Sequence, residues 1–175
     1  NPHFIYNTMN IINSLARLKR NQDIIQINTA LIRILQDRLR IDGIEIYDTV
    51  QQEIETLKQY LLIMMYRYKN KPNIVYNIDP DLIDASIPKN IILPLVENAL
   101  LHGLQINNSG EKTALLEISI YQRDDRMVIE VFDTGEGMSD EQVTQLNSMT
   151  ARSSKERGKH LGVNNLRSRL KYLYN

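Results

Sequence analysis

The 175-residue sequence contains no cysteine, carries no net charge and has no long apolar run. Without cysteine the chain can form neither a disulfide framework nor a thiolate metal site, which fits a reducing compartment. The 21 basic residues balance the 21 acidic ones, so the charge does not indicate direct binding to nucleic acid or to a membrane surface. No apolar stretch approaches the roughly 18 to 20 residues that span a bilayer.

The amino end lacks two further features. It has neither the basic and apolar segments of a signal peptide nor an initiator methionine. We therefore expect a piece of a longer protein, with any membrane anchor or sensor outside this chain.

Apolar residues recur at helical spacing in the first part of the chain. The spacing predicts helices over residues 2–20, 23–40 and 48–68. Only a short polar break separates the first two, so they should pack as an antiparallel hairpin. The apolar arc of the first helix is broader than one partner helix covers, which predicts dimerisation into a four-helix bundle. Its apolar positions are Phe4, Ile5, Met9, Ile11, Ile12, Leu15, Ala16 and Leu18.

Strands and helices alternate in the second part of the chain. Strands are expected at Ile74–Ile78, Glu117–Gln122 and Met127–Asp133. Helices are expected from Lys89 to Gly103, from Ser139 onward and from Val163 to Tyr172, with a loop at 150–160. The fold class is therefore α+β: a helical hairpin over residues 1–45 and an α/β module over 73–175. A connecting helix lies within 46–72, and the sequence leaves its module open.

The segment Asp133–Met138 follows an expected strand and reads DTGEGM. A carboxylate at a strand end can accept a hydrogen bond from an exocyclic amine such as that of adenine. Gly135 and Gly137 would let the backbone pass close to a planar ring. Asp and Gly are also common where strands turn, and this motif alone favours a simple turn.

Two polar residues, Glu97 and Asn98, interrupt an otherwise apolar helix. His102 lies four residues beyond Asn98 and so on the same helical face. A magnesium triphosphate would satisfy these polar groups. A hydrogen-bonded core helix that ends at Gly103 explains them equally well.

A third motif opens the last expected helix. Gly162 precedes the helix, and the basic residues Lys159 and His160 precede the glycine. Free N–H groups at such a helix start can bind phosphate. The alternative is a flexible linker before a surface helix.

In this order the three motifs resemble the nucleotide-binding boxes of the gyrase, Hsp90, histidine kinase and MutL ATPase superfamily. Residues 1–10, NPHFIYNTMN, are similar to the NPHFLFNTLN signature of the LytS/YesM-type sensor histidine kinases. Residues 93–103, LPLVENALLHG, are similar to their LPLVENAxxHG segment. The resemblance covers nearly the whole chain. It implies a dimerisation hairpin followed by an α/β-sandwich ATPase domain.

The resemblance also assigns roles to residues. It makes His3 the phosphoacceptor and assigns Asn98 to the binding of Mg²⁺. From its position one helical turn beyond His3, Asn7 could orient the imidazole ring or a water molecule. The residues that the resemblance places at ATP are Glu97, Asn98, His102, Asp133, Gly135, Gly137, Met138, Lys159, Gly162 and Asn165, with residues 150–161 as a lid. It implies a homodimeric kinase that passes phosphate to an aspartate of a response regulator receiver domain. The chain would be the cytoplasmic portion of a bacterial cell-membrane protein.

Four departures from the family pattern leave other interpretations open. His160 stands where a glycine is expected and could narrow phosphate access or contact phosphate itself. Pro94 stands where gyrase-type ATPases carry a water-activating Glu, so efficient hydrolysis is not expected. No acidic residue follows His3, so the general base is open. The closing strands of the family are missing from the sequence, so we expect either a truncated fragment or disordered residues that are left out.

The alternatives to a kinase are a nucleotide-responsive dimeric scaffold without phosphotransfer and an ATP-hydrolysing relative of gyrase or Hsp90. Only a kinase would incorporate γ-labelled phosphate from ATP into the protein itself. Steady release of phosphate without such labelling would indicate the ATPase.

Overall fold

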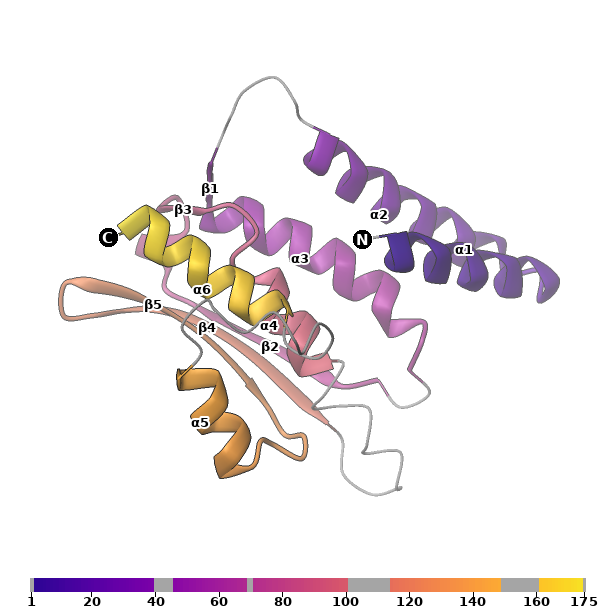
Figure 1. Ribbon diagram of the computed structural model, residues 1–175. Coiled ribbons are helices and arrows are strands. Elements are labelled where there is room, and N and C mark those ends of the chain that lie inside the picture. The colour runs from indigo at the N-terminus through magenta and orange to yellow at the C-terminus, as the bar shows by residue number, and fades with distance from the viewer. Residues whose placement is uncertain (1, 40–45, 69–70, 101–113, 149–160, 175) are drawn as a thin grey trace.

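The computed structural model describes residues 2–39, 46–68, 71–100, 114–148 and 161–174. A three-stranded sheet carries helices on one face, and a helical hairpin packs beyond them (Figure 1). The helical amino-terminal region and the mixed α/β region confirm the predicted α+β class.

The hairpin consists of α1 (Pro2–Arg17) and α2 (Asn21–Leu39). Lys19 adopts a φ of 56° in the turn between them, where the Arg20 amide donates to the Leu15 carbonyl at 2.9 Å. Arg20 then pairs with Asp23 in the first turn of α2 at 2.6 Å. An acidic residue at this end of a helix is favoured by the helix dipole.

The third helix, α3 (Val50–Met65), begins at a capping box. The Gln52 amide donates to the Thr49 hydroxyl at 3.2 Å, and the Thr49 amide donates to the Gln52 side chain at 2.9 Å. These two bonds satisfy amide groups that a helix start otherwise leaves without a partner.

Two tyrosines directly after α3 form hydrogen bonds with elements on both sides of this helix. The Tyr66 hydroxyl donates to Asp23 of α2 at 2.7 Å. The Tyr68 hydroxyl donates to the Leu100 carbonyl, directly after α4 (Leu93–Asn98), at 3.1 Å. The connecting helix therefore contacts both the hairpin and the α/β region.

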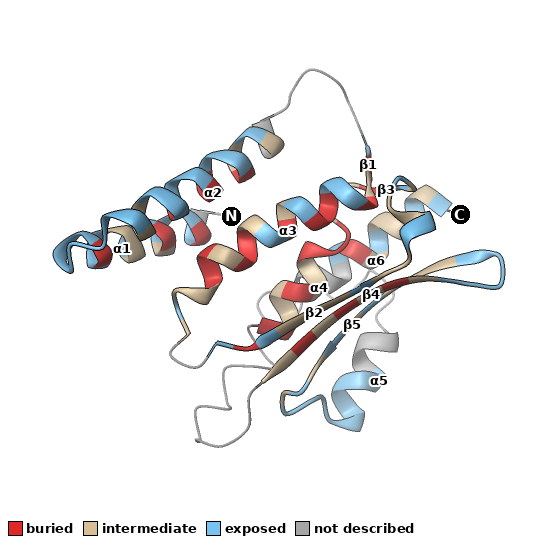
Figure 2. Cartoon of the chain, turned by 180° about the vertical axis from the view of Figure 1, so that it is seen from behind, coloured by how far each residue is buried: buried red, intermediate tan, exposed pale blue. Residues whose placement is uncertain are grey.

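The sheet is formed by β2 (Asn73–Ile78), β4 (Leu115–Arg123) and β5 (Arg126–Asp133), in the order β2-β4-β5. β2 runs parallel to β4, and β5 runs antiparallel to it. Leu116, Ile118 and Ile120 alternate along β4 and are fully buried. Their even spacing turns all three to the face covered by helices. Figure 2 shows this buried layer between the sheet and the helices.

Two short strands were not predicted from the sequence. β1 (Tyr47–Thr49) pairs antiparallel with β3 (Ser86–Pro88), and the 3-10 turn η1 (Pro80–Leu82) precedes β3. A three-residue strand has too few positions to show a period of two.

The predicted helix start at Lys89 is wrong, because residues 89–92 form a turn and α4 begins at Leu93. Asn90 in this turn has a φ of 56°, outside the helical region. Pro94 lies in the first helical turn, as expected.

The remaining helices are α5 (Asp140–Ser148) and α6 (Leu161–Tyr174). α6 packs against α4 on the helix-covered face of the sheet, whereas α5 lies on the other side (Figure 1). Among the described residues, no helix is both long and apolar enough to cross a membrane.

Candidate functional site

The helix α4 carries two of the predicted site residues, Glu97 and Asn98, both half-buried. Its buried Val96, Ala99 and Leu100 anchor it in the core. Ala99 and Leu100 continue the helix in a π-helical turn directly after Asn98. Such turns widen a helix locally and recur at functional sites.

Glu97 lies beside a buried tyrosine of α3. Tyr60 is only 4% exposed, and burial, together with the negative charge of Glu97, raises the pKa of its hydroxyl. The hydroxyl therefore stays protonated and can donate toward the carboxylate. On α1, the Phe4 ring stacks on Tyr60 with centroids 5.2 Å apart and planes at 26°. One tyrosine thus contacts both the helix of His3 and a residue adjacent to Asn98.

The carboxyl end of β5 carries Asp133, whose Oδ1 accepts a hydrogen bond from the Gly135 amide at 2.8 Å. A carboxylate has several acceptor sites, so this turn still allows Asp133 to bind a ligand amine. The Leu115 amide donates to the Thr134 hydroxyl at 2.9 Å and holds the start of the loop to β4.

Gly137 adopts a φ of 71°, a backbone conformation that favours glycine. A Cβ at this position would have no atom within 4 Å, so the glycine is needed for conformation and not for clearance within the chain. Met138, next to it, is 40% exposed. The loop thus offers an open, partly apolar surface.

The amino end of α6 carries Gly162 in its first turn and Asn165 one turn later, where Asn165 is exposed. Figure 1 shows α4 and the amino end of α6 above the end of the sheet at which β5 finishes. The described parts of the three predicted motifs therefore lie near the same end of the sheet. His102 and Lys159 lie outside the described residues, as does nearly all of the expected lid.

His3 is exposed in the first turn of α1. The Asn7 amide nitrogen lies 3.1 Å from its Nδ1 and 3.4 Å from its Nε2, so it can donate to an unprotonated ring nitrogen. α1 packs on α2, and Figure 1 shows α3 between α1 and the sheet. His3 is therefore not gathered with α4, β5 and α6.

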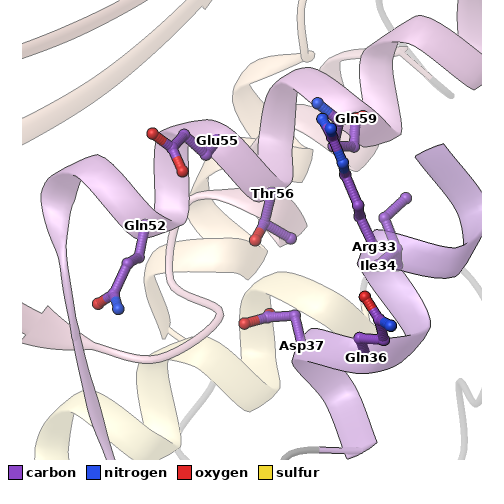
Figure 3. A pocket seen from close by; sticks show the side chains of 8 residues that line it. All are labelled: Arg33, Ile34, Gln36, Asp37, Gln52, Glu55, Thr56 and Gln59. Atoms are coloured by element: carbon purple, nitrogen blue, oxygen red, sulfur yellow. The ribbon is translucent and has the colours of Figure 1, made fainter. Parts of the chain in front are cut away.

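A separate polar groove of about 610 Å³ lies between α2 and α3. Figure 3 shows its side chains: Arg33, Ile34, Gln36 and Asp37 from α2 face Gln52, Glu55, Thr56 and Gln59 from α3. None of them belongs to the predicted site.

Comparison with known proteins agrees with this arrangement. Residues 83–175 match the family described as histidine kinase-, DNA gyrase B- and HSP90-like ATPases. The chain belongs to this ATPase family. Residues 1–72 match the histidine kinase family, so the family membership predicted from the motifs is confirmed. Membership implies ATP binding by the second part of the chain.

Curated relatives align along almost the whole chain. The sensor histidine kinase YpdA of Escherichia coli is 31% identical over 99% of this chain and 29% of its own length. The sensor protein LytS of Staphylococcus epidermidis is 32% identical over 99% of this chain and 28% of its own length. LytS of Oceanobacillus iheyensis is 28% identical over 97% of this chain and 28% of its own length. The chain thus spans less than a third of the length of these relatives.

Two residues at the edge of the site, Glu53 and Tyr60, were missed by reasoning from the sequence. Both lie on the buried side of α3 with Val50 and Leu57. Glu53 lies three residues after Val50 and four before Leu57, on the apolar face of the helix. A carboxylate at such a position is a signal that could have identified it. Tyr60 carries no such signal, because a tyrosine on an apolar stripe is ordinary core.

Proposed function

We propose that this chain is the kinase core of a bacterial sensor histidine kinase, which uses ATP to phosphorylate its own His3. The supporting observation is that one chain combines an exposed histidine in a histidine kinase match with the predicted nucleotide motifs in an ATPase match. The phosphoryl group then passes to an aspartate of a response regulator receiver domain. The chain acts in the cytoplasm as part of a membrane-anchored homodimer.

The described residues fit a magnesium nucleotide. Half-buried Asn98 offers an amide oxygen, a ligand type that Mg²⁺ accepts. Within the described ranges no three His, Cys, Asp or Glu side chains cluster as a metal site. Phosphate oxygens and water would therefore supply the other ligands, as is usual for Mg²⁺. The bound ion would neutralise charge on the phosphates.

Each of the remaining predicted residues contacts one part of the nucleotide. Asp133 reads the adenine amine, while Gly135, Gly137 and Met138 form the ring surface. Glu97 and His102 flank the magnesium ligand. Lys159, Gly162 and Asn165 contact the phosphates, because free amides at a helix start favour anions.

In the proposed reaction an unprotonated ring nitrogen of His3 attacks the γ-phosphorus of ATP. A nitrogen–phosphorus bond forms, the bond from that phosphorus to the β–γ bridging oxygen breaks, and ADP leaves. Asn7 orients the imidazole through its 3.1 Å contact, and alignment of this kind supplies much of the rate in phosphoryl transfer. Because α3 lies between α1 and the sheet, the hairpin must move or the second protomer must supply the nucleotide.

The test is transfer of γ-labelled phosphate from ATP to the complete protein. We expect acid-labile label in the wild-type protein and none in His3→Gln. Asn13→Gln, an exposed change on the same helix, serves as the matched control and should keep the label. Persistent labelling of His3→Gln would remove His3 from its role.

A nucleotide-binding scaffold without phosphotransfer is the second candidate, favoured by the position of α3 between α1 and the sheet. It predicts that Asp133→Ala abolishes ATP binding while no phosphohistidine forms in the wild-type protein under any condition.

A further inference from the structure

The carboxyl group of Glu53 is buried where α3 meets the turn before α4, with only 6% of the residue exposed. It accepts three backbone hydrogen bonds from this turn. The Asn90 amide donates to Oε1 at 2.6 Å, and the amides of Ile91 and Ile92 donate to Oε2 at 3.1 and 3.3 Å. One side chain thus satisfies three consecutive amides that lie 37 to 39 residues further along the chain.

These amides need an external acceptor because the start of α4 provides none. Ile92 at the helix start forms no side-chain cap, and Pro94 in the first turn has no amide hydrogen. The positive φ of Asn90 bends the chain so that the three amides converge on one point. Glu53 therefore caps α4 from another helix.

Other elements hold the same turn. The Lys89 amide donates to the Ile46 carbonyl at 2.9 Å, and the Lys89 ammonium lies 3.7 Å from the carboxylate of Asp48 in β1. The guanidinium of Arg169 on α6 donates to the Lys89 carbonyl. The turn is therefore fixed to α3, β1 and α6 at once, and Glu53 is its contact with α3.

We propose that Glu53 is a positioning residue for the phosphate end of the nucleotide: by fixing where α4 begins, it sets the position of Asn98. From Ile92 to Asn98 the helix rises only about 9 Å. Because so short a helix moves as one unit, a shift of its first residue also shifts the side-chain amide oxygen of Asn98. Asp133 lies on β5 and is held by its own turn, so the adenine end does not depend on Glu53. This inference rests on the nucleotide role proposed for Asn98.

The test compares Mg·ATP with adenosine, which lacks the phosphates. In the complete protein, Glu53→Gln should weaken Mg·ATP binding by about tenfold, as expected when one polar contact is misplaced, and leave adenosine affinity unchanged. Mg·ATP is measured by titration calorimetry and adenosine by NMR titration. Glu55→Gln is the matched control, because Glu55 lies on the same helix, is exposed and accepts only from Gln51 at 3.2 Å among the described contacts.

Equal losses for both ligands would make Glu53 a purely structural residue, and unchanged Mg·ATP binding would overturn the inference outright. A wild-type protein that folds but does not bind Mg·ATP would overturn the proposed function and this inference with it. If the Glu53→Gln protein does not fold, amide hydrogen exchange of the wild-type protein with and without Mg·ATP tests the positioning role instead. The inference expects Mg·ATP to slow exchange at residues 90–92 together with 93–98, and protection of 93–98 alone would contradict it.

Discussion

Two titratable side chains of α3, Glu53 and Tyr60, are buried against the turn and helix that carry Asn98. Burial is the main cause that raises the pKa of both groups. For Glu53 the three backbone amides act in the opposite direction, and the negative charge of Asp48 adds to the rise. A buried polar or charged group is tolerated only with fixed partners, so the carboxyl group of Glu53 and the hydroxyl group of Tyr60 make specific contacts between elements.

The raised pKa of Glu53 gives stability a defined pH dependence. In the folded chain this carboxyl holds its proton to a higher pH than the ordinary 4.5, so the unfolded chain binds fewer protons between these two values. The contribution of Glu53 to the free energy of unfolding should therefore fall as the pH rises through that window. Urea unfolding at successive pH values should show this slope in the wild-type protein but not in Glu53→Gln. Parallel curves for the two proteins would contradict it.

The Phe4–Tyr60 stack is a second residue-scale contact that can be tested. Phe4→Ala removes a ring that is 8% exposed and should lower the free energy of unfolding by about 3 kcal/mol or more. The chain offers a matched control in its other phenylalanine, since Phe132 is 52% exposed. Phe132→Ala should cost much less by urea unfolding. Similar losses for the two variants would show that Phe4 is not a core contact.

At the scale of elements, α3 connects the two parts of the fold. Directly after α3, Tyr66 donates to Asp23 of α2 and Tyr68 donates to the Leu100 carbonyl beyond α4. Glu53 within α3 caps α4. The hydrogen bond from Tyr66 lowers the pKa of Asp23, which keeps that carboxylate ionised as an acceptor. The hairpin and the helix that carries Asn98 are therefore linked through α3 and the residues directly after it.

The capping box at the start of α3 predicts the effect of one substitution on this connection. Thr49→Ala removes the acceptor of the Gln52 amide and should destabilise the protein by about 1 kcal/mol in urea unfolding. Thr29→Ala is the control, because the Thr29 hydroxyl is exposed and donates only to the carbonyl four residues earlier in the described structure. Its effect should stay within about 0.5 kcal/mol. A Thr49→Ala protein as stable as this control would show that the box contributes nothing.

At the scale of the whole molecule, the hairpin leaves large apolar side chains uncovered. The exposed ones in α1, α2 and the turn between them are Ile5, Tyr6, Met9, Leu18, Ile25 and Ile32, with exposures of 39 to 72%. Figure 2 shows the outer faces of both helices as exposed. The predicted apolar arc of α1 is thus only partly covered within one chain, which supports the proposed four-helix bundle.

This surface predicts the oligomeric state. The wild-type protein should be a dimer, and the double variant Ile25→Asp/Ile32→Asp should be a monomer, because dimer formation would bury its carboxylates. Val143→Asp changes an exposed apolar residue of α5, across the sheet, and should leave the dimer intact. Light scattering after size-exclusion chromatography measures the mass. A double variant that stays dimeric would place the interface elsewhere.

Local periodicity and contiguous motifs were enough to predict the hairpin, the three long strands, the α+β class and the family. The Asp133–Gly135 turn and the position of Pro94 also followed from neighbouring residues. The start of α4 and the pairing of β1 with β3 did not, because each joins segments about forty residues apart. The contacts of α3 with both parts of the fold and the capping of α4 by Glu53 become visible only in the folded chain. Hydrogen bonds between distant segments form once packing has brought them together, and no periodicity in the chain records them.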